Sequence, residues 1–182
     1  LETLNGSTID VVAGKNRYTL NENSCANIII EDDKVKIELT SGGLFANMDE
    51  PGVISVMGKD ISAQNGVFSV SAPYGSAAVY VLENEVELDA KTYKAGQAAD
   101  ILSSGIEDRE LSIGALNEFE LSQIEKVSAE KTLCFGAEDV RKLEADREKQ
   151  RQDALDAKLL EEDEETSIDE QRRENEQNTN ES

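Results

Sequence analysis

Histidine and tryptophan are absent from this chain of 182 residues, and only two prolines, four phenylalanines and four tyrosines are present. Without histidine the chain lacks the usual general base near neutral pH and the commonest zinc ligand, which excludes a Ser-His-Asp or Cys-His site. No glycine-rich phosphate-binding motif is present either. We therefore expect no catalytic, cofactor-binding or metal-binding residues, and a protein that is not an enzyme.

Long apolar runs are also missing, since none approaches the roughly 20 residues that a membrane helix needs. The first residue is Leu1 rather than Met. A processed or trimmed start would remove a signal peptide, so the sequence leaves the anchoring of the parent protein open. We expect a parent protein that is membrane-anchored by a segment outside this sequence. The formal net charge of -21 argues against nucleic acid and anionic membranes as partners. A protein or a cell-envelope component is the expected partner, and the oligomeric state stays open.

Only two cysteines are present, Cys25 and Cys134. In an oxidising compartment they can form a disulfide, which would close a long loop and stabilise the fold by about 2–4 kcal/mol. The alternative is two unpaired thiols, one or both buried as small apolar residues. The residues alone leave both alternatives open.

Charge divides what is present into two parts. Residues 1–136 carry 10 basic and 22 acidic residues, whereas the much shorter stretch 137–182 carries 8 and 17. A segment with so much charge and so few apolar residues cannot bury enough surface to offset its ordering entropy. We divide the chain into a β-domain (1–104), a short helical or irregular extension packed on the sheet (105–136), a solvated charged helix (137–160) and an acidic disordered tail (161–182).

Alternating patterns predict most of the strands. Residues 34–39 and 85–89 alternate between polar and apolar side chains, which is typical of a sheet with one dry face. The continuous apolar runs 28–30 and 79–82 predict strands covered on both faces. Asn65-Gly66 lies between two apolar segments and predicts a tight hairpin. Short strands joined by short turns predict a mainly β fold, a sandwich or roll of short, mostly antiparallel strands, with C-terminal helical segments.

Helical spacing appears only after these strands. Leu116, Phe119 or Leu121, and Ile124 recur at intervals that predict a short helix with one apolar face against the sheet. From residue 137 the sequence is rich in good helix formers, with acidic residues first and basic residues after them, which suits the helix dipole. Because apolar residues do not continue at helical spacing, we expect a solvated helix there.

Two stretches near the end of the predicted sheet resemble a known family. Residues 79–88, followed by residues 93–101, are similar to the end of FecR-like domains, where V-x-V-L-x-G-x-V-x-V precedes x-L-x-A-G-Q-x-A-x-V. Residues 18–24 and 38–48 resemble earlier motifs of that family in the same order. The resemblance covers about residues 8–102 and implies a bacterial extracytoplasmic domain, at the cell surface or in the periplasm.

The resemblance also implies a backbone conformation at three positions. Asn84 stands where the family usually has glycine, and Gly43 and Gly96 stand where strands turn and restart, so we expect left-handed or bulged backbone there. The Arg-Gly-Thr turn that many members carry is missing. The implied function is a non-catalytic binding or structural module of the cell envelope. The alternative is the signal-sensing ectodomain of a membrane-spanning, anti-sigma-type regulator.

Three turns carry candidate binding residues. Tyr74, in Pro73-Tyr74-Gly75, is a candidate partner contact if it is exposed, although it could instead cover the end of the sheet. The acidic turns at residues 31–33 and 49–50 offer oxygen ligands for calcium. Neither turn has the EF-hand spacing, so we expect solvated turns rather than a metal site.

Overall fold

The computed structural model describes the backbone of residues 1–31 and 34–180, and the side chains of residues 1–30 and 35–158. It divides into two compact units, Leu1–Val140 and the chain from Arg141 onward. The strands are β1 (Ile9–Ala13), β2 (Asn16–Leu20), β3 (Cys25–Glu31), β4 (Lys34–Met48), β5 (Gly52–Val56), β6 (Lys59–Ala63), β7 (Gly66–Ala72), β8 (Ala77–Leu88), β9 (Lys91–Lys94), β10 (Gln97–Leu102) and β11 (Gly105–Glu110). A short 3-10 helix η1 (Ile113–Ala115), α1 (Glu118–Val127) and α2 (Ala137–Asn180) follow.

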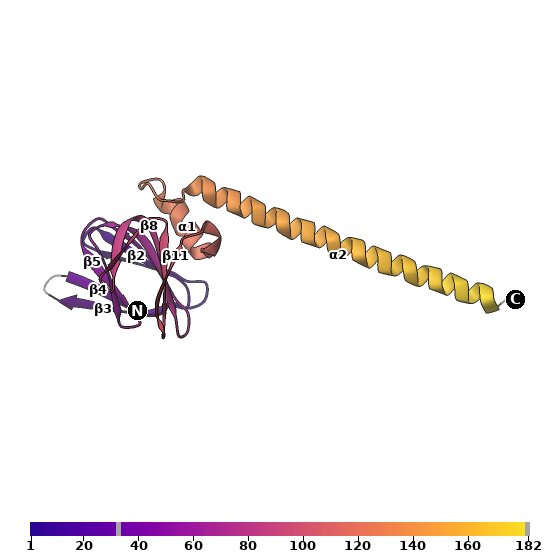
Figure 1. Ribbon diagram of the computed structural model, residues 1–182, viewed down its shortest axis with the longest axis horizontal. Helices are drawn as coiled ribbons and strands as arrows, with labels where there is room; N and C mark the ends of the chain where they lie inside the picture. The colour runs from indigo at the N-terminus through magenta and orange to yellow at the C-terminus, as the bar shows by residue number, and fades with distance from the viewer. Residues whose placement is uncertain (32–33, 181–182) are drawn as a thin grey trace. The chain divides into compact units, whose positions relative to one another are not determined.

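Two long strands, β4 and β8, run through both sheets of the domain (Figure 1). Sheet A has the order β3-β4-β5-β6-β8-β9. Sheet B has the order β1-β2-β4-β7-β8-β10-β11. Every pair is antiparallel except β4 with β5, which is parallel. The fold is therefore the predicted mainly β roll of mostly antiparallel strands, followed by helices.

The core lies between the inner faces of the two sheets. In sheet A, Ile37, Ile54, Ile61 and Leu88 lie in one cross-strand row, and all four are fully buried. Each such side chain contributes about 1.5–3 kcal/mol by leaving water. The alternation predicted for residues 34–39 and 85–89 is confirmed over the described side chains 36–39 and 85–89, because the apolar residues are buried and the polar residues between them are more exposed.

A second buried layer lies on the outer face of sheet B, under α1. Phe45, Val67 and Leu82 alternate with inward-facing neighbours and are buried there, as are Leu121 and Ile124 of α1. Residues 79–82 are therefore covered on both faces, as predicted. The predicted helix packed on the sheet is also confirmed.

The predicted hairpin at Asn65-Gly66 is wrong. Strand β6 pairs with β5 and β8, whereas β7 pairs with β4 and β8, so the two strands flanking this turn do not pair with each other. Gly66 has φ +126°, and the chain crosses here from sheet A to sheet B. The long pairings of β7 with β4 and β8 bury its apolar residues on both faces, which outweighs the local hairpin preference.

The prediction that residues 28–30 are covered on both faces is also wrong. Strand β3 lies at the edge of sheet A and pairs along its length only with β4. Ile28 is 37% exposed and Ile30 is 71% exposed. An apolar run in an edge strand gives the same sequence signal as one in a central strand.

The left-handed positions agree in part with the family resemblance. Asn84 has φ +59° and Gly96 has φ +86°, as expected. The prediction for Gly43 is wrong, because the left-handed residue is its neighbour Gly42, at φ +90°. A Cβ at Gly42 would lie 2.5 Å from the Ser24 Cα, so glycine is needed there for close approach of two strands.

The domain boundaries also differ from those predicted. Strand β11 pairs with β10 and extends the sheet beyond residue 104. The sequence did not predict this strand because it is a charged, mostly exposed edge strand without an apolar pattern. Helix α2 begins where predicted, and the Asp139 carboxylate accepts the Gly136 N–H at 2.8 Å just before it.

The backbone of residues 161–180 is helical where the sequence predicts a disordered tail, since glutamate, glutamine and arginine favour helix without a core. The end of that predicted tail, residues 181–182, lies outside the described residues, and disorder of the tail in solution stays a prediction. No helix of the described chain is both long and apolar enough to cross a membrane.

Candidate functional site

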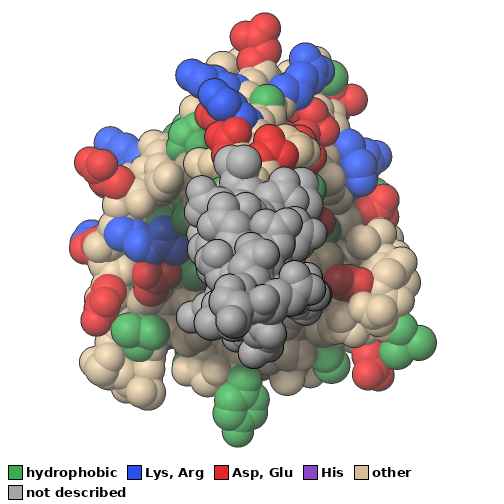
Figure 2. All heavy atoms as spheres, turned by 90° about the vertical axis from the view of Figure 1, so that its right-hand side faces the viewer, with side chains coloured by type: hydrophobic (Ala, Val, Ile, Leu, Met, Phe, Trp, Pro, Cys, Tyr) green, Lys and Arg blue, Asp and Glu red, His purple; other side chains and the backbone are tan. Residues whose placement is uncertain are grey.

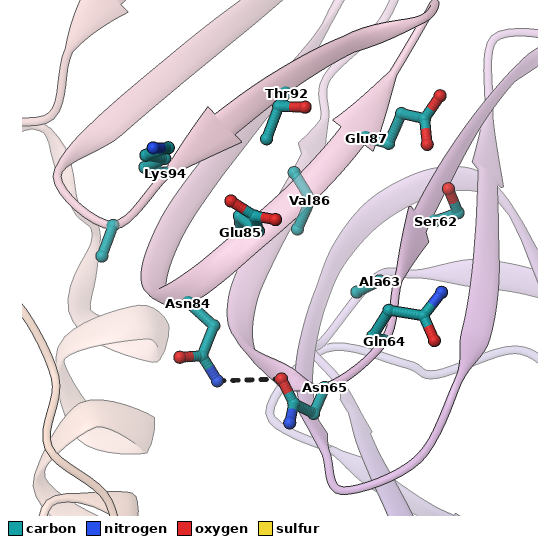
Figure 3. Close-up of a pocket in the computed structure, with 11 residues that line it drawn as sticks. Ser62, Ala63, Gln64, Asn65, Asn84, Glu85, Val86, Glu87, Thr92 and Lys94 are labelled. Atoms are coloured by element: carbon teal, nitrogen blue, oxygen red, sulfur yellow. Dashed lines mark hydrogen bonds between the residues drawn. The ribbon is translucent and has the colours of Figure 1, made fainter.

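A polar groove lies on the outer face of sheet A, beside the crossing from β6 to β7 (Figure 3). Strand β6 pairs with β8 only at Ile61 and Ser62, and the groove lies where the two strands are no longer paired. Its volume is about 510 Å³. Its walls come from β6, β8, β9 and the crossing, namely Ser62, Ala63, Gln64, Asn65, Asn84, Glu85, Val86, Glu87, Thr92, Lys94 and Ala95.

At the rim of the groove, one side-chain hydrogen bond joins strand β8 to the crossing between β6 and β7. The Asn84 amide donates a hydrogen bond to the Asn65 Oδ1 at 3.0 Å, as the dashed line in Figure 3 shows. Glu85 and Lys94 lie opposite each other on β8 and β9. Carboxylates, an ammonium group and amides at an open surface can hold a polar ligand by hydrogen bonds.

Tyr74 lies at the far end of β7 and β8, and its side chain is fully exposed. The Ser76 N–H donates to the Pro73 carbonyl at 3.2 Å, and Gly75 has φ +80°, which are features of a type II turn. The alternative that Tyr74 covers the end of the sheet is therefore wrong. The turn instead presents the aromatic ring to solvent.

The cysteine pair is not a disulfide in this structure, which corrects the disulfide alternative. Both thiols are free. Cys25 begins β3 opposite Ser41, whereas the Cys134 backbone N–H donates to the Leu82 carbonyl on β8 at 2.8 Å. Cys25 is therefore held in β3, and Cys134 is held beside β8 in the segment between α1 and α2. Burial raises the pKa of the Cys134 thiol, which disfavours the reactive thiolate.

The acidic turn at residues 49–50 is occupied by protein contacts. The Asn16 side chain accepts the Asp49 and Glu50 N–H groups at 2.9 and 3.0 Å. The Lys131 ammonium lies 2.5 Å from the Asp49 carboxylate and 3.8 Å from that of Glu83. Asp49 therefore anchors the segment that follows α1. In the turn at residues 31–33, Asp32 and Asp33 lie outside the described residues, and the residues that are described contain no group of three or more potential metal ligands.

Two hydrogen-bond networks involve residues of α1 and of β11, and both are buried or half-buried. The Glu120 carboxylate accepts the Ser69 hydroxyl at 3.0 Å and the Asn117 N–H at 2.8 Å, and burial raises its pKa. Arg109 forms two hydrogen bonds with Asp100, at 2.7 and 3.1 Å, and its guanidinium lies 5.2 Å from the centre of the Tyr80 ring. Both networks fasten elements to sheet B.

Sequence reasoning missed these contacts, although one had a signal. Asn117 and Glu120 have the spacing of a capping box, which the structure confirms. The contacts of Arg109 on β11 and of Lys131 after α1 have no local sequence pattern that predicts them. Around the face shown in Figure 2, basic and acidic side chains are interspersed rather than separated by sign.

Two crystal structures of a "putative anti-sigma factor" from Parabacteroides distasonis ATCC 8503 share the fold of this chain. Their TM-scores are 0.58 and 0.57, and their sequence identities are 16% and 17%. The alignments cover 68% of this chain and 64% and 63% of the Parabacteroides chains. This chain thus spans less than two thirds of their length, and at this identity the likeness is one of fold alone.

Sequence comparisons add nothing to that fold likeness. No family model matches the chain, and no curated protein matches it.

Proposed function

We propose that this chain is a non-catalytic, extracytoplasmic binding domain that serves as the signal-sensing part of a membrane-spanning regulator of the anti-sigma type. The fold likeness to the two Parabacteroides structures, which are described as a putative anti-sigma factor, supports this proposal. It favours the signalling alternative over a purely structural envelope module.

The FecR-like assignment is a finer part of the same proposal. It is supported by the left-handed backbone at Asn84 and Gly96, the positions where the family motif has glycine. Asn84 is the last residue of β8 that pairs with β7, and Gly96 directly precedes β10, which pairs again with β8. The family motif has its glycines at these two positions. The matching positions describe how strands turn, and none of them carries chemistry.

Binding rather than catalysis is supported by the character of the exposed surfaces. The groove over sheet A is open, and its charged residues are solvated. The exposed ring of Tyr74 is a rigid aromatic group of the kind that anchors protein interfaces. A protein or cell-envelope component is therefore the proposed partner, with Tyr74 among its contacts.

A transcript measurement in cells that carry the complete gene tests this function. Genome-wide transcript levels are measured after in-frame removal of the coding region for residues 1–140, the compact β-rich unit. We expect altered expression of a small set of genes that share one alternative sigma factor. Tyr74→Ala should weaken the same response, whereas Met57→Ala, at another exposed turn, should not.

Unchanged transcripts on removal of the domain would rule out signalling and leave the structural envelope module. A protease added to intact cells or spheroplasts tests the location separately, because an extracytoplasmic domain is digested without lysis. Digestion that requires lysis would contradict the proposed location.

A further inference from the structure

A second pocket lies between helix α1 and two turns from the first part of the chain. Its volume is about 600 Å³. The walls come from residues 6–8, from residues 21–22 after β2, and from α1 with its N-cap residue Asn117. All of these described residues belong to the compact unit Leu1–Val140, and none of them lines the groove on sheet A. We call this second site the α1 pocket.

The walls of the α1 pocket are fixed by contacts with the rest of the β-rich unit. The Gly6 N–H donates to the Glu22 carboxylate and so joins the two turns. The Asn21 N–H donates to the Gly43 carbonyl of β4 at 2.9 Å. Helix α1 is held against sheet B by its buried apolar face. The pocket therefore has its shape before a ligand binds, which lowers the entropic cost of binding.

Two asparagines at the pocket keep their NH2 groups available. The Asn21 Oδ1 accepts the Glu22 N–H at 2.8 Å. The Asn117 Oδ1 accepts the Glu120 N–H at 3.2 Å. Because each side-chain oxygen is engaged, the orientation of both amides is fixed, and each NH2 group is left with its two donors. Across the residues that the structure describes, neither NH2 group donates a hydrogen bond within the protein.

Gln123 on α1 is a buried amide that also lines the α1 pocket. It is only 6% exposed, and its accessible part lies at the pocket wall. Within the described part of the chain, its side chain has no hydrogen-bond partner. A buried amide costs free energy unless its donor and acceptor are paired. A partner can reach this amide through the pocket, so Gln123 favours a ligand that carries hydroxyl or amide groups.

Phe119 supplies an apolar surface beside these three amides. Its side chain is half-buried and lines the same pocket. A Cβ at Gly43 would lie 3.8 Å from the Phe119 Cε1, so the ring lies close to the backbone of β4. The face of an aromatic ring is electron-rich and attracts the C–H groups of a ligand. A sugar has such C–H groups on the face of its ring and hydroxyl groups around it, which matches a phenyl ring beside amides.

The charges at the pocket favour a neutral ligand over an ion. Its described lining mixes two carboxylates, Glu22 and Glu118, with one ammonium group, that of Lys126. The N-terminus of α1, which could otherwise attract a phosphate, is closed by the capping box of Asn117 and Glu120. An anionic ligand would be repelled by the two glutamates, and a cationic ligand by the lysine.

We propose that the α1 pocket binds a short neutral saccharide. The sugar ring lies against Phe119, and its hydroxyl groups accept hydrogen bonds from the NH2 groups of Asn21 and Asn117. Gln123 both donates to the sugar and accepts from it, which gives its buried amide a partner. This site is separate from Tyr74 and goes beyond the proposed function, because it names the chemical class of a ligand and requires no signalling role.

Saturation-transfer NMR with the full chain tests the site. The neutral probes are glucose, galactose, mannose, N-acetylglucosamine, lactose and cellobiose, and the anionic probes are glucuronic and galacturonic acid. We expect at least one neutral sugar of this panel to bind with a dissociation constant of about 1 mM or lower. Both uronic acids should bind at least about fivefold more weakly than that sugar, because the pocket carries two glutamates.

Two variants make the test specific to the pocket. Gln123→Met removes the amide at similar volume and should weaken sugar binding about tenfold. Its thermal unfolding midpoint should equal or exceed that of the wild type, because no buried amide is left unpaired. Phe119→Leu should also weaken binding about tenfold. The matched controls are Phe135→Leu, at a half-buried phenylalanine that does not line the pocket, and Gln152→Met on α2, and both should leave affinity within about twofold.

Several results would overturn the site. The absence of a signal from every neutral sugar of the panel would refute it, as would uronic acids that bind as tightly as the neutral sugars. Equal affinity of the wild type and both pocket variants would show that the sugar binds elsewhere. A signal from an end-blocked serine tripeptide, with none from the sugars, would assign the pocket to a protein partner instead. None of these results bears on the transcript experiment, so the two proposals fail separately.

Discussion

The Glu120 carboxylate on α1 lies 3.0 Å from the Ser69 hydroxyl on β7, and both side chains are buried. This contact fastens the helix to the outer face of sheet B. Burial raises the pKa of Glu120 above its ordinary value. A carboxyl group with a raised folded pKa stabilises the fold in its protonated form, and that contribution is lost as the pH rises.

Glu120→Gln should therefore change the pH dependence of stability. The cost of ionising Glu120 is absent below pH of about 4, its unfolded pKa, and grows as the pH rises through the folded value. Relative to the wild type, the free energy of unfolding of Glu120→Gln should rise across that window. Urea unfolding at several pH values measures it. Glu118→Gln, in the same helical turn but exposed, should show no such trend, and parallel curves for both variants would contradict the prediction.

Lys131 neutralises two carboxylates that come from different elements of the fold. Its side chain is 19% exposed and that of Glu83 is 17% exposed, and the Glu83 Oε2 has no hydrogen-bond partner. Lys131→Met should lower the free energy of unfolding by about 1–2 kcal/mol, because Glu83 keeps a half-buried charge without its cation. Thermal unfolding measures the loss. Adding Glu83→Gln should restore part of it, whereas Lys126→Met, on the exposed side of α1, should have little effect.

Gly42 and Gly58 both have left-handed backbone, with φ +90° and +72°, but only Gly42 is crowded. A Cβ at Gly42 would lie 2.2 Å from the Ser24 Oγ, whereas one at Gly58 would meet nothing within 4 Å. Gly58→Ala should cost about 1 kcal/mol, for the backbone alone. Gly42→Ala should cost at least about 3 kcal/mol, since β3 must shift as well. Equal losses in urea unfolding would show that the close approach at Ser24 is absent.

The free thiols make a direct prediction for the cysteines. Under denaturing but non-reducing conditions, alkylation followed by mass spectrometry should find two modified thiols per chain, at Cys25 and Cys134. In the folded protein Cys134 should react slowly at neutral pH, because its raised pKa keeps the thiol protonated. A species that lacks two hydrogens and resists alkylation would restore the disulfide.

Limited proteolysis should separate the two units of the chain. Trypsin should cleave α2 from Arg141 onward, because that part of the helix is highly charged and does not belong to the β-rich unit Leu1–Val140. The fragment ending near Val140, which is fully buried, should resist digestion. A full-length chain that survived prolonged digestion would contradict this division.

The sequence was most informative where a structural feature depends on a short stretch of neighbouring residues. Alternation located the faces of β4 and β8, and helical spacing located α1, because burial on one face selects for period. The left-handed Asn84 was predictable from the family motif. Tyr74 was predictable as a turn residue, since its neighbours are proline and glycine.

The remainder depends on which strands become neighbours, and no local pattern encodes that. Asn65-Gly66 has the composition of a hairpin, but its flanking strands pair elsewhere. The apolar run in β3 looks like a central strand, but it lies at an edge. The contacts of Lys131 join residues far apart in sequence, so they cannot be predicted before the topology of the strands is known.

The shared strands β4 and β8 also determine how the domain can come apart. Each is covalently continuous from sheet A into sheet B, so neither sheet can detach while the other keeps all of its strands. A partly melted form that retained one intact sheet would leave half of each long strand without hydrogen-bond partners. We therefore expect a single cooperative transition for the β-domain, with circular dichroism and tyrosine fluorescence giving the same midpoint.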